Sequence, residues 1–171
     1  QHEGWINVES ELLKGTTFKI YIPAFSGKLS DRISETNVIE DLKGKGEKIL
    51  LVEDDQRMRE FTMNFLNENG YVVSVASNAK EGMDLFVKNN GDFHLIFSDI
   101  ILTDKSGIEL VKEFRSIKPN IRILLSSGYT DDKVQWYEIK RKRFQYIQKP
   151  YKLHELLRTI KDNVTFIKMS D

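Results

Sequence analysis

Five short apolar runs alternate with helix-period segments between Lys48 and the end of the chain. The runs read KILLVE, YVVSVA, HLIFSD, IRILLS and FQYIQK. Between them, apolar residues recur at spacings of three and four, as in Leu110, Val111 and Phe114. Nearly continuous apolar strands joined by helices are typical of a parallel sheet covered on both faces. Each helix that joins two parallel strands forms a crossover connection, and such connections are right-handed. This part of the chain therefore predicts an α/β fold with a doubly wound, five-stranded parallel sheet.

The first 23 residues follow a different, alternating pattern. WINVES and TTFKIYI alternate apolar and polar positions, with ELLKG between them, and this predicts a β-hairpin. Residues 24–47 are polar and contain several glycines, so we interpret them as a linker. The predicted division is therefore a hairpin over residues 1–23, a linker over 24–47 and an α/β domain over 48–171.

The composition argues against several classes of function. The 171 residues carry 26 basic and 26 acidic side chains, so no overall basic field favours nucleic acid. The absence of cysteine excludes disulfides and thiolate metal sites and fits a reducing, cytoplasmic compartment. No apolar run approaches the roughly 20 residues of a membrane helix. The chain begins QHEGW, without an initiator Met, and we expect it to be a piece of a longer protein, which can itself be membrane-anchored.

Charged and hydroxyl side chains stand at the carboxyl ends of four of the predicted strands. They are Glu53, Asp54, Asp99, Ser127 and Lys149. Because the carboxyl ends of parallel strands share one edge of the sheet, these groups should converge there. Each alone has a simpler explanation, since Asp and Ser are common in turns and helix caps and Lys is usually solvated. It is their combination that indicates a site.

The converging groups have the character of a cation site. Two carboxylates about 4 Å apart repel by roughly 4 kcal/mol at an effective dielectric constant near 20, so three such acids need a compensating cation. Mg²⁺ fits a site with few protein ligands and several waters. A carboxylate held between the metal and Lys149 can attack phosphorus as a nucleophile. Ser127 can donate a hydrogen bond to a phosphoryl oxygen.

The segments around these residues resemble a known family. ILLVEDDQRMR, SDIILTDKSGIEL, ILLSSGYT and YIQKP are similar, in order and spacing, to the signature segments of receiver domains, the phosphoacceptor modules of bacterial two-component signalling. The resemblance runs from about Lys48 to Val164. It implies a five-stranded flavodoxin-like fold that takes a phosphoryl group from a histidine on a kinase or phosphotransfer domain.

The same resemblance implies roles for individual residues. Asp99 would be the phosphorylated residue, and Lys149 and Ser127 would complete the catalytic set. The Mg²⁺ ligands would be Glu53, Asp54, Asp99 and the backbone carbonyl of Ile101. The Lys149–Pro150 peptide bond would be cis.

Further expectations concern a conformational switch that follows phosphorylation and two departures from the family pattern. Tyr146 would turn inward when the hydroxyl of Ser127 moves to the phosphate. Thr103 stands where many members have Pro, which is expected to change the loop shape and leave the chemistry intact. Glu53 replaces an Asp, and its longer side chain is expected to reach the ion through water.

The N-terminal piece resembles the end of a histidine kinase ATP-binding domain. EGWINVESELLKGTTFKIYIP is similar to the closing strands of such domains, although Leu13 replaces a glycine of their last glycine motif. The earlier motifs that bind adenine and Mg-ATP do not occur, so this piece is not a complete ATP site. The chain would then be the C-terminal part of a hybrid sensor histidine kinase, a transferase. Its receiver would promote its own phosphorylation and dephosphorylation.

The expected partner is a histidine kinase or a histidine phosphotransfer domain. Trp136 and the basic run Lys140–Arg143 follow the fourth strand. They are either a partly buried aromatic beside solvated charges or a partner surface, including one for a homodimer. Contact with nucleic acid is not expected of this fragment, because only TFIKMSD remains after the last helix. Contact of this fragment with a membrane is not expected either.

Two other functions are alternatives to a phosphoacceptor. A receiver-like module that binds proteins and is never phosphorylated would not need Asp99, Lys149 and the acidic pair. A nucleotide-binding α/β enzyme would need a glycine-rich turn after the first strand, where EDDQRMR stands instead.

Overall fold

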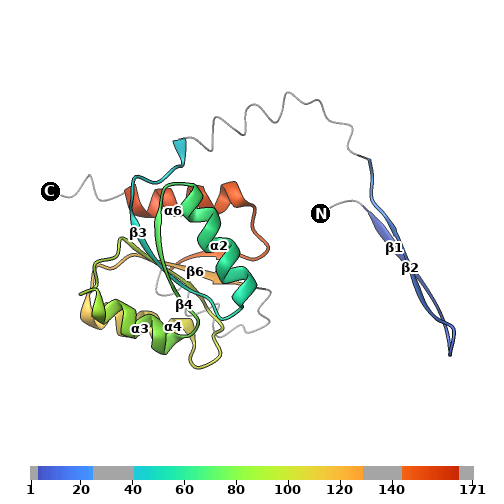
Figure 1. The fold of residues 1–171 in the computed structure, drawn as a ribbon, viewed down its shortest axis with the longest axis horizontal. Helices are drawn as coiled ribbons and strands as arrows, with labels where there is room; N and C mark the ends of the chain where they lie inside the picture. The colour runs from blue at the N-terminus through green and yellow to red at the C-terminus, as the bar shows by residue number, and fades with distance from the viewer. Residues whose placement is uncertain (1–3, 25–40, 129–143, 166–171) are drawn as a thin grey trace. The chain divides into compact units, whose positions relative to one another are not determined.

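The chain forms two units, one within residues 1–37 and the other within residues 38–171. The computed structural model describes residues 4–24, 41–128 and 144–165 (Figure 1). Trp136 and Lys140–Arg143, for which a partner surface is one of the two interpretations, lie outside these ranges. No helix within the described ranges is long and apolar enough to cross a bilayer.

The first unit contains the predicted β-hairpin. Strands β1 (Trp5–Glu11) and β2 (Gly15–Tyr21) pair antiparallel, so the alternating pattern of these residues is confirmed as a hairpin. The turn has two residues with positive φ, Leu13 at 63° and Gly15 at 103°. A left-handed conformation costs roughly 1–2 kcal/mol for a residue with a Cβ, so Leu13 adopts a backbone shape that glycine would adopt more easily.

The two faces of this hairpin differ in polarity. On one face, Trp5 stacks on Tyr21 with their ring centroids 3.9 Å apart, and polar residues continue along the strands. The other face is apolar, and every one of its four large residues is more than half exposed: Ile6, Val8, Phe18 and Ile20.

The second unit is built on a five-stranded parallel sheet. Its strands are β3 (Lys48–Val52), β4 (Val72–Ala76), β5 (Leu95–Asp99), β6 (Ile123–Ser127) and β7 (Gln145–Gln148). They lie in the order β4-β3-β5-β6-β7, and every neighbouring pair is parallel. The chain therefore winds outward in both directions from β3, as the alternation of strands and helices predicts.

Helices cover both faces of this sheet (Figure 1). Helices α2 (Gln56–Glu68) and α6 (Leu153–Thr165) share a core with one face, and α3 (Ala79–Lys88) and α4 (Gly107–Ile117) share a core with the other. Successive residues of β3 enter opposite cores, which is why its buried residues are all apolar instead of alternating with polar ones.

Residues 42–46, which their composition assigns to the linker, contact this second unit. Leu42 is buried, and its carbonyl accepts a hydrogen bond from the hydroxyl of Tyr71 at 3.0 Å. The backbone of Gly44 passes so close to Gly70 that a Cβ on Gly44 would lie 2.8 Å from the Gly70 carbonyl oxygen. The chain thus enters the α/β unit along a fixed path before β3 begins.

Candidate functional site

Backbone register brings four strand ends to one edge of the sheet. The last register pairs of neighbouring strands are Val52 with Ser98, Asp99 with Ser126, and Ser127 with Gln148. Glu53 therefore emerges beside Asp99, and Lys149 emerges beyond Ser127. The predicted convergence at the carboxyl edge of the sheet follows directly from this pairing.

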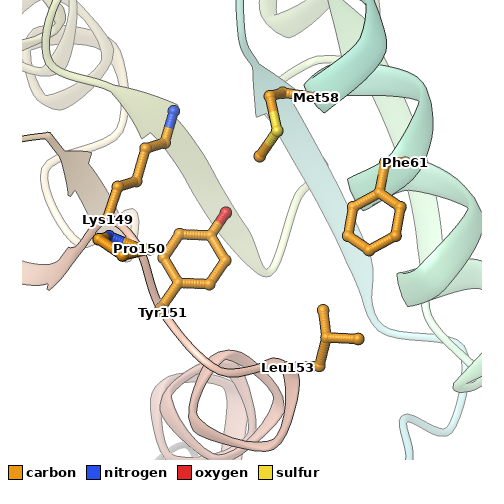
Figure 2. A pocket seen from close by; sticks show the side chains of 6 residues that line it. All are labelled: Met58, Phe61, Lys149, Pro150, Tyr151 and Leu153. Atoms are coloured by element: carbon orange, nitrogen blue, oxygen red, sulfur yellow. The ribbon is translucent and has the colours of Figure 1, made fainter. Parts of the chain in front are cut away.

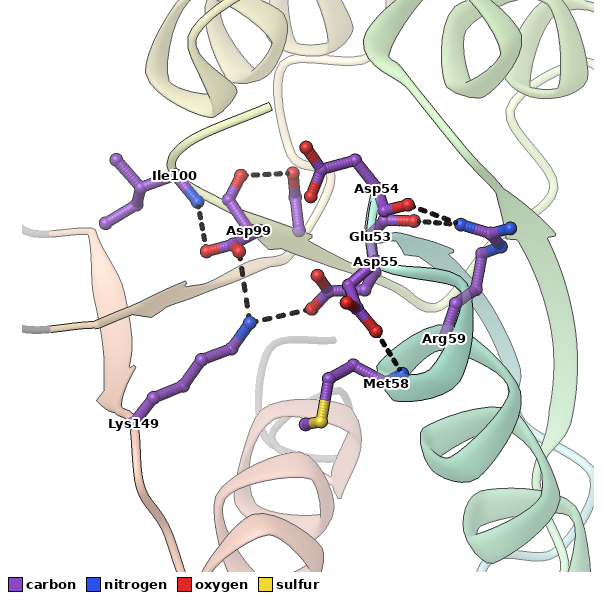
Figure 3. A network of polar contacts seen from close by, with 9 residues as sticks. Glu53, Asp54, Asp55, Met58, Arg59, Asp99, Ile100 and Lys149 are labelled. Carbon is purple, nitrogen blue, oxygen red and sulfur yellow. Dashed lines mark hydrogen bonds and ion pairs between the residues drawn. The ribbon is translucent and has the colours of Figure 1, made fainter. Parts of the chain in front are cut away.

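Lys149 joins two of the predicted acids (Figure 3). Its Nζ lies 2.7 Å from Glu53 Oε2 and 3.0 Å from Asp99 Oδ2. The Glu53 side chain is only 7% exposed and that of Asp99 15% exposed, so both ion pairs are largely shielded from water. Carboxylate oxygens of Glu53, Asp54 and Asp99 all lie within 4.8 Å of one another.

Burial and the ion pairs of Lys149 shift the pKa values in this group. Burial is the main cause that raises the pKa of Glu53, and the charge of Asp99 adds to it, while Lys149 lowers it by less. Burial lowers the pKa of Lys149, but its contacts with Glu53 and Asp99 more than offset this, and the pKa is raised overall. Lys149 is therefore held as an ammonium, and Glu53 ionises less readily than an ordinary glutamate.

Asp99 is held in one orientation by the backbone that follows it. The N–H of Ile100 donates to Asp99 Oδ1 at 2.9 Å, which leaves the other carboxylate oxygen toward Lys149. Gly107, the first residue of α4, donates its N–H to the Ile100 carbonyl at 2.8 Å. A Cβ on Gly107 would lie 2.1 Å from the carbonyl oxygen of Asp99, so this close approach requires glycine.

Two neighbouring residues shape the acidic loop after β3. Asp55 is the N-cap of α2 and accepts the Met58 N–H at 2.8 Å, whereas Glu53 and Asp54 belong to the acidic cluster. Arg59 donates to the backbone carbonyls of Glu53 at 2.7 Å and Asp54 at 3.1 Å (Figure 3). The capping pattern could have identified Asp55 from the sequence. No local pattern identifies Arg59, because it contacts main-chain atoms.

The remaining predicted residues lie around the same edge. Ser127 is buried, and its hydroxyl donates to the Gly128 carbonyl at 3.0 Å. Tyr146 on β7 is 38% exposed. Ile101 forms an antiparallel bridge with Ser106 across the loop between β5 and α4. The Lys149–Pro150 bond is cis, which confirms that prediction.

The acidic cluster suits a divalent cation. Among the residues that the structure describes, three carboxylates lie close together beside one ammonium, that of Lys149, which pairs with Glu53 and Asp99, and a charge of about −2 is left when all three are ionised. The ligand atoms available are carboxylate oxygens, which hard cations prefer. Mg²⁺ therefore fits this residue set in both charge and ligand type.

Fold and site together define a class of protein: a doubly wound α/β domain with a cluster of carboxylates and a lysine at the carboxyl edge of its sheet. Comparison with known families agrees with this class. Residues 49–161 match the family described as the response regulator receiver domain, and the chain belongs to that family. It is thus a receiver domain of two-component signalling, joined to an N-terminal hairpin.

Curated relatives include a sensor kinase and several transcriptional regulators. The chain is 29% identical over 169 residues to the sensor kinase CckA of Brucella abortus, a match that covers 95% of this chain and 18% of the kinase. It is 34% identical over 116 residues to the transcriptional regulatory protein CusR of Escherichia coli, covering 67% of this chain and 49% of CusR. The chain thus spans half or less of these relatives.

Solved structures show the same fold. A CheY-like response regulator receiver domain protein from Methanospirillum hungatei superposes with a TM-score of 0.62 at 29% sequence identity. The superposition covers 71% of this chain and 95% of that structure.

Proposed function

We propose that Asp99 accepts a phosphoryl group from a phosphohistidine. The Asp99 carboxylate forms an O–P bond as the P–N bond to the histidine ring breaks, and the bonding electron pair returns to the ring nitrogen. The observation that carries the proposal is the position of Lys149, whose ammonium lies 3.0 Å from the Asp99 carboxylate and can balance charge on an incoming phosphoryl group.

The acids beside Asp99 are proposed to hold Mg²⁺. Asp54, Asp99 and the carbonyl of Ile101 are the proposed direct ligands, and Glu53 is proposed to contact the ion through water. When bound, Mg²⁺ would supply positive charge to the phosphoryl oxygens. The low exposure of Glu53 and its contact with Lys149 support an indirect role for it, since its carboxylate is already engaged.

Ser127 and Tyr146 are proposed to be the switch. A phosphorylated side chain carries a charge of about −1.5 to −2, which would draw the hydroxyl of Ser127 away from Gly128. Tyr146 would then move from its partly exposed position toward the space that Ser127 leaves. A nearly complete shift between two states needs about 5.5 kcal/mol, which several charge-assisted hydrogen bonds can supply together.

An apolar pocket next to Lys149 is proposed to receive the histidine-bearing partner. The pocket has a volume of about 420 Å³ and is lined by Met58, Phe61, Lys149, Pro150, Tyr151 and Leu153 (Figure 2). Phe61 is 52% exposed although it lies on a core-packing helix. Because Lys149 lines both the pocket and the acidic site, a partner seated here would bring its histidine to Asp99.

The hairpin supports a hybrid kinase as the parent protein. Two strands alone are marginally stable in water, and the four apolar residues on one hairpin face suit packing against further parts of a larger domain. The match to the sensor kinase CckA covers 95% of the chain and so includes the hairpin as well as the receiver. We therefore assign residues 1–23 to the end of a kinase ATP-binding domain, and the whole chain to the cytoplasm, where ATP is available.

A beryllofluoride titration in the presence of Mg²⁺ tests the central proposal. Beryllofluoride mimics a phosphoryl group on a carboxylate. We expect the NMR signals of Ser127, Tyr146 and the residues around Lys149 to shift in the wild-type chain, and Asp99→Asn to abolish the shifts. Unchanged spectra in the wild type, or an equal response in the variant, would favour the alternative of a binding module that is never phosphorylated.

A further inference from the structure

The loop between β5 and α4 is attached to a neighbouring helix by one side chain, that of Asp104. Its Oδ1 accepts the N–H of Ala79 at 2.9 Å, and its Oδ2 accepts the N–H of Lys80 at 3.0 Å. These are the first two residues of α3. The N-cap of α3 is Asn78, which accepts the N–H of Glu81 at 2.8 Å. The first three N–H groups of the helix thus have side-chain acceptors, two from Asp104 in a distant loop and one from the adjacent N-cap residue Asn78.

The anchor point on α3 is rigid. Ala79 is 1% exposed and belongs to the hydrophobic core shared by α3, α4 and the sheet. A carboxylate at a helix N-terminus is also favoured by the helix dipole. Burial raises the pKa of Asp104, but the backbone hydrogen bonds it accepts, with those from Ala79 and Lys80 first, and the charge of Lys105 together lower it by more, and the pKa is reduced overall. Asp104 is therefore ionised at neutral pH.

Other contacts hold the loop at its ends, at Leu102, which is buried in the same core, and at Lys105, which pairs with Glu113 of α4. Gly107 donates to the Ile100 carbonyl, and Ile101 bridges to Ser106, so these contacts close the loop on itself. The Ile101 side chain is 59% exposed and contributes little packing that would fix its carbonyl. Asp104 supplies a link from the middle of the loop to a separate, buried element.

We propose that Asp104 is a positioning residue: by fastening the β5–α4 loop to the start of α3, it holds Ile101 and Asp99 in the arrangement that binds Mg²⁺. This inference rests on the proposed function. It also implies that binding of Mg²⁺ at the acidic cluster is communicated to the first turn of α3, through the two hydrogen bonds of one carboxylate.

Three variants of the full chain separate positioning from helix capping. Asp104→Ala removes the acceptor and frees the loop, and Asp104→Asn keeps one acceptor oxygen. Asn78→Ala is the matched control, because it removes an acceptor from the same helix end without freeing the loop. Mg²⁺ affinity is measured by NMR titration, and hydrogen exchange at Ala79 and Lys80 is measured without metal, so neither readout depends on phosphorylation.

We expect Asp104→Ala to weaken Mg²⁺ binding about tenfold, at the lower end of the range for residues that support metal ligands. Asp104→Asn should lie between it and the wild type, and Asn78→Ala should stay within about twofold of the wild type. Wild-type Mg²⁺ affinity in all three variants, with faster exchange at the start of α3, would show that Asp104 is only a helix cap. Failure of the wild-type chain itself to bind Mg²⁺ would instead overturn the proposed function and, with it, this inference.

Discussion

Removing one charge from the acidic cluster should make the metal-free protein more stable. Asp54→Asn is the most informative change, because it leaves both ion pairs of Lys149 in place. At an effective dielectric constant of about 20, two unit charges 4.8 Å apart repel by about 3.5 kcal/mol. Asp54 is repelled by two carboxylates and attracted by one ammonium. The attraction offsets about one of the two repulsions, so the net repulsion on Asp54 is about that of a single carboxylate. Because Asp54 is only half-buried, screening reduces the expected gain to about 1–2 kcal/mol.

Urea unfolding with and without Mg²⁺ measures this effect. In EDTA at low ionic strength, the variant should exceed the wild type in free energy of unfolding. Mg²⁺ at ten times its dissociation constant should stabilise the wild type by about 1.4 kcal/mol and leave the variant unchanged. Asp162→Asn, an exposed change on α6, is the control and should stay within about 0.5 kcal/mol. A variant no more stable than the wild type in EDTA would refute the view that these acids repel one another.

Two further predictions concern Glu53 and the apolar pocket. Because the folded-state pKa of Glu53 is raised, the folded protein binds this proton more tightly than the unfolded chain, so metal-free stability should rise as pH falls from neutral through that pKa toward 4.5. Urea titrations in EDTA should show this rise in the wild type, and its persistence in Glu53→Gln would be evidence against Glu53 as its source. Phe61→Ser should slow phosphotransfer from a histidine-bearing donor but leave beryllofluoride binding intact, whereas Ile117→Ser, an equally exposed change on α4, should alter neither. Equal phosphotransfer rates in the two variants would exclude the pocket as the docking site.

Much of the fold could be predicted because its determinants are local. Continuous apolar runs define buried parallel strands, and their carboxyl ends must share an edge, which is enough to group Asp99 with Lys149 and the acids after β3. The cis Lys149–Pro150 bond came from the family resemblance and is confirmed.

The features that escaped prediction depend on contacts with main-chain atoms or on the packing of whole elements. Asp104 accepts hydrogen bonds from backbone N–H groups of α3, and Arg59 donates to carbonyls of the loop before its own helix. Neither contact leaves a recognisable spacing of residue types in the sequence. Phe61 follows the apolar period of α2 yet is exposed, because that apolar stripe is wider than the part of the helix that meets the core. The composition around Leu42 is that of a linker, yet Leu42 is buried. Its burial could not be predicted, because the residues that contact it, such as Tyr71, lie far along the chain.

The position of Glu53 suggests that the proposed metal ion has a second role besides balancing the charge of the phosphoryl group. The ammonium of Lys149 is shared, at 2.7 Å from Glu53 and 3.0 Å from Asp99. If Asp99 is the acceptor, a phosphoryl group adds negative charge on that side, and Lys149 must move toward it. Glu53 would then lose its partner while remaining 7% exposed, and an unpaired buried carboxylate is costly. A cation at the cluster therefore compensates Glu53 as well as the phosphoryl group.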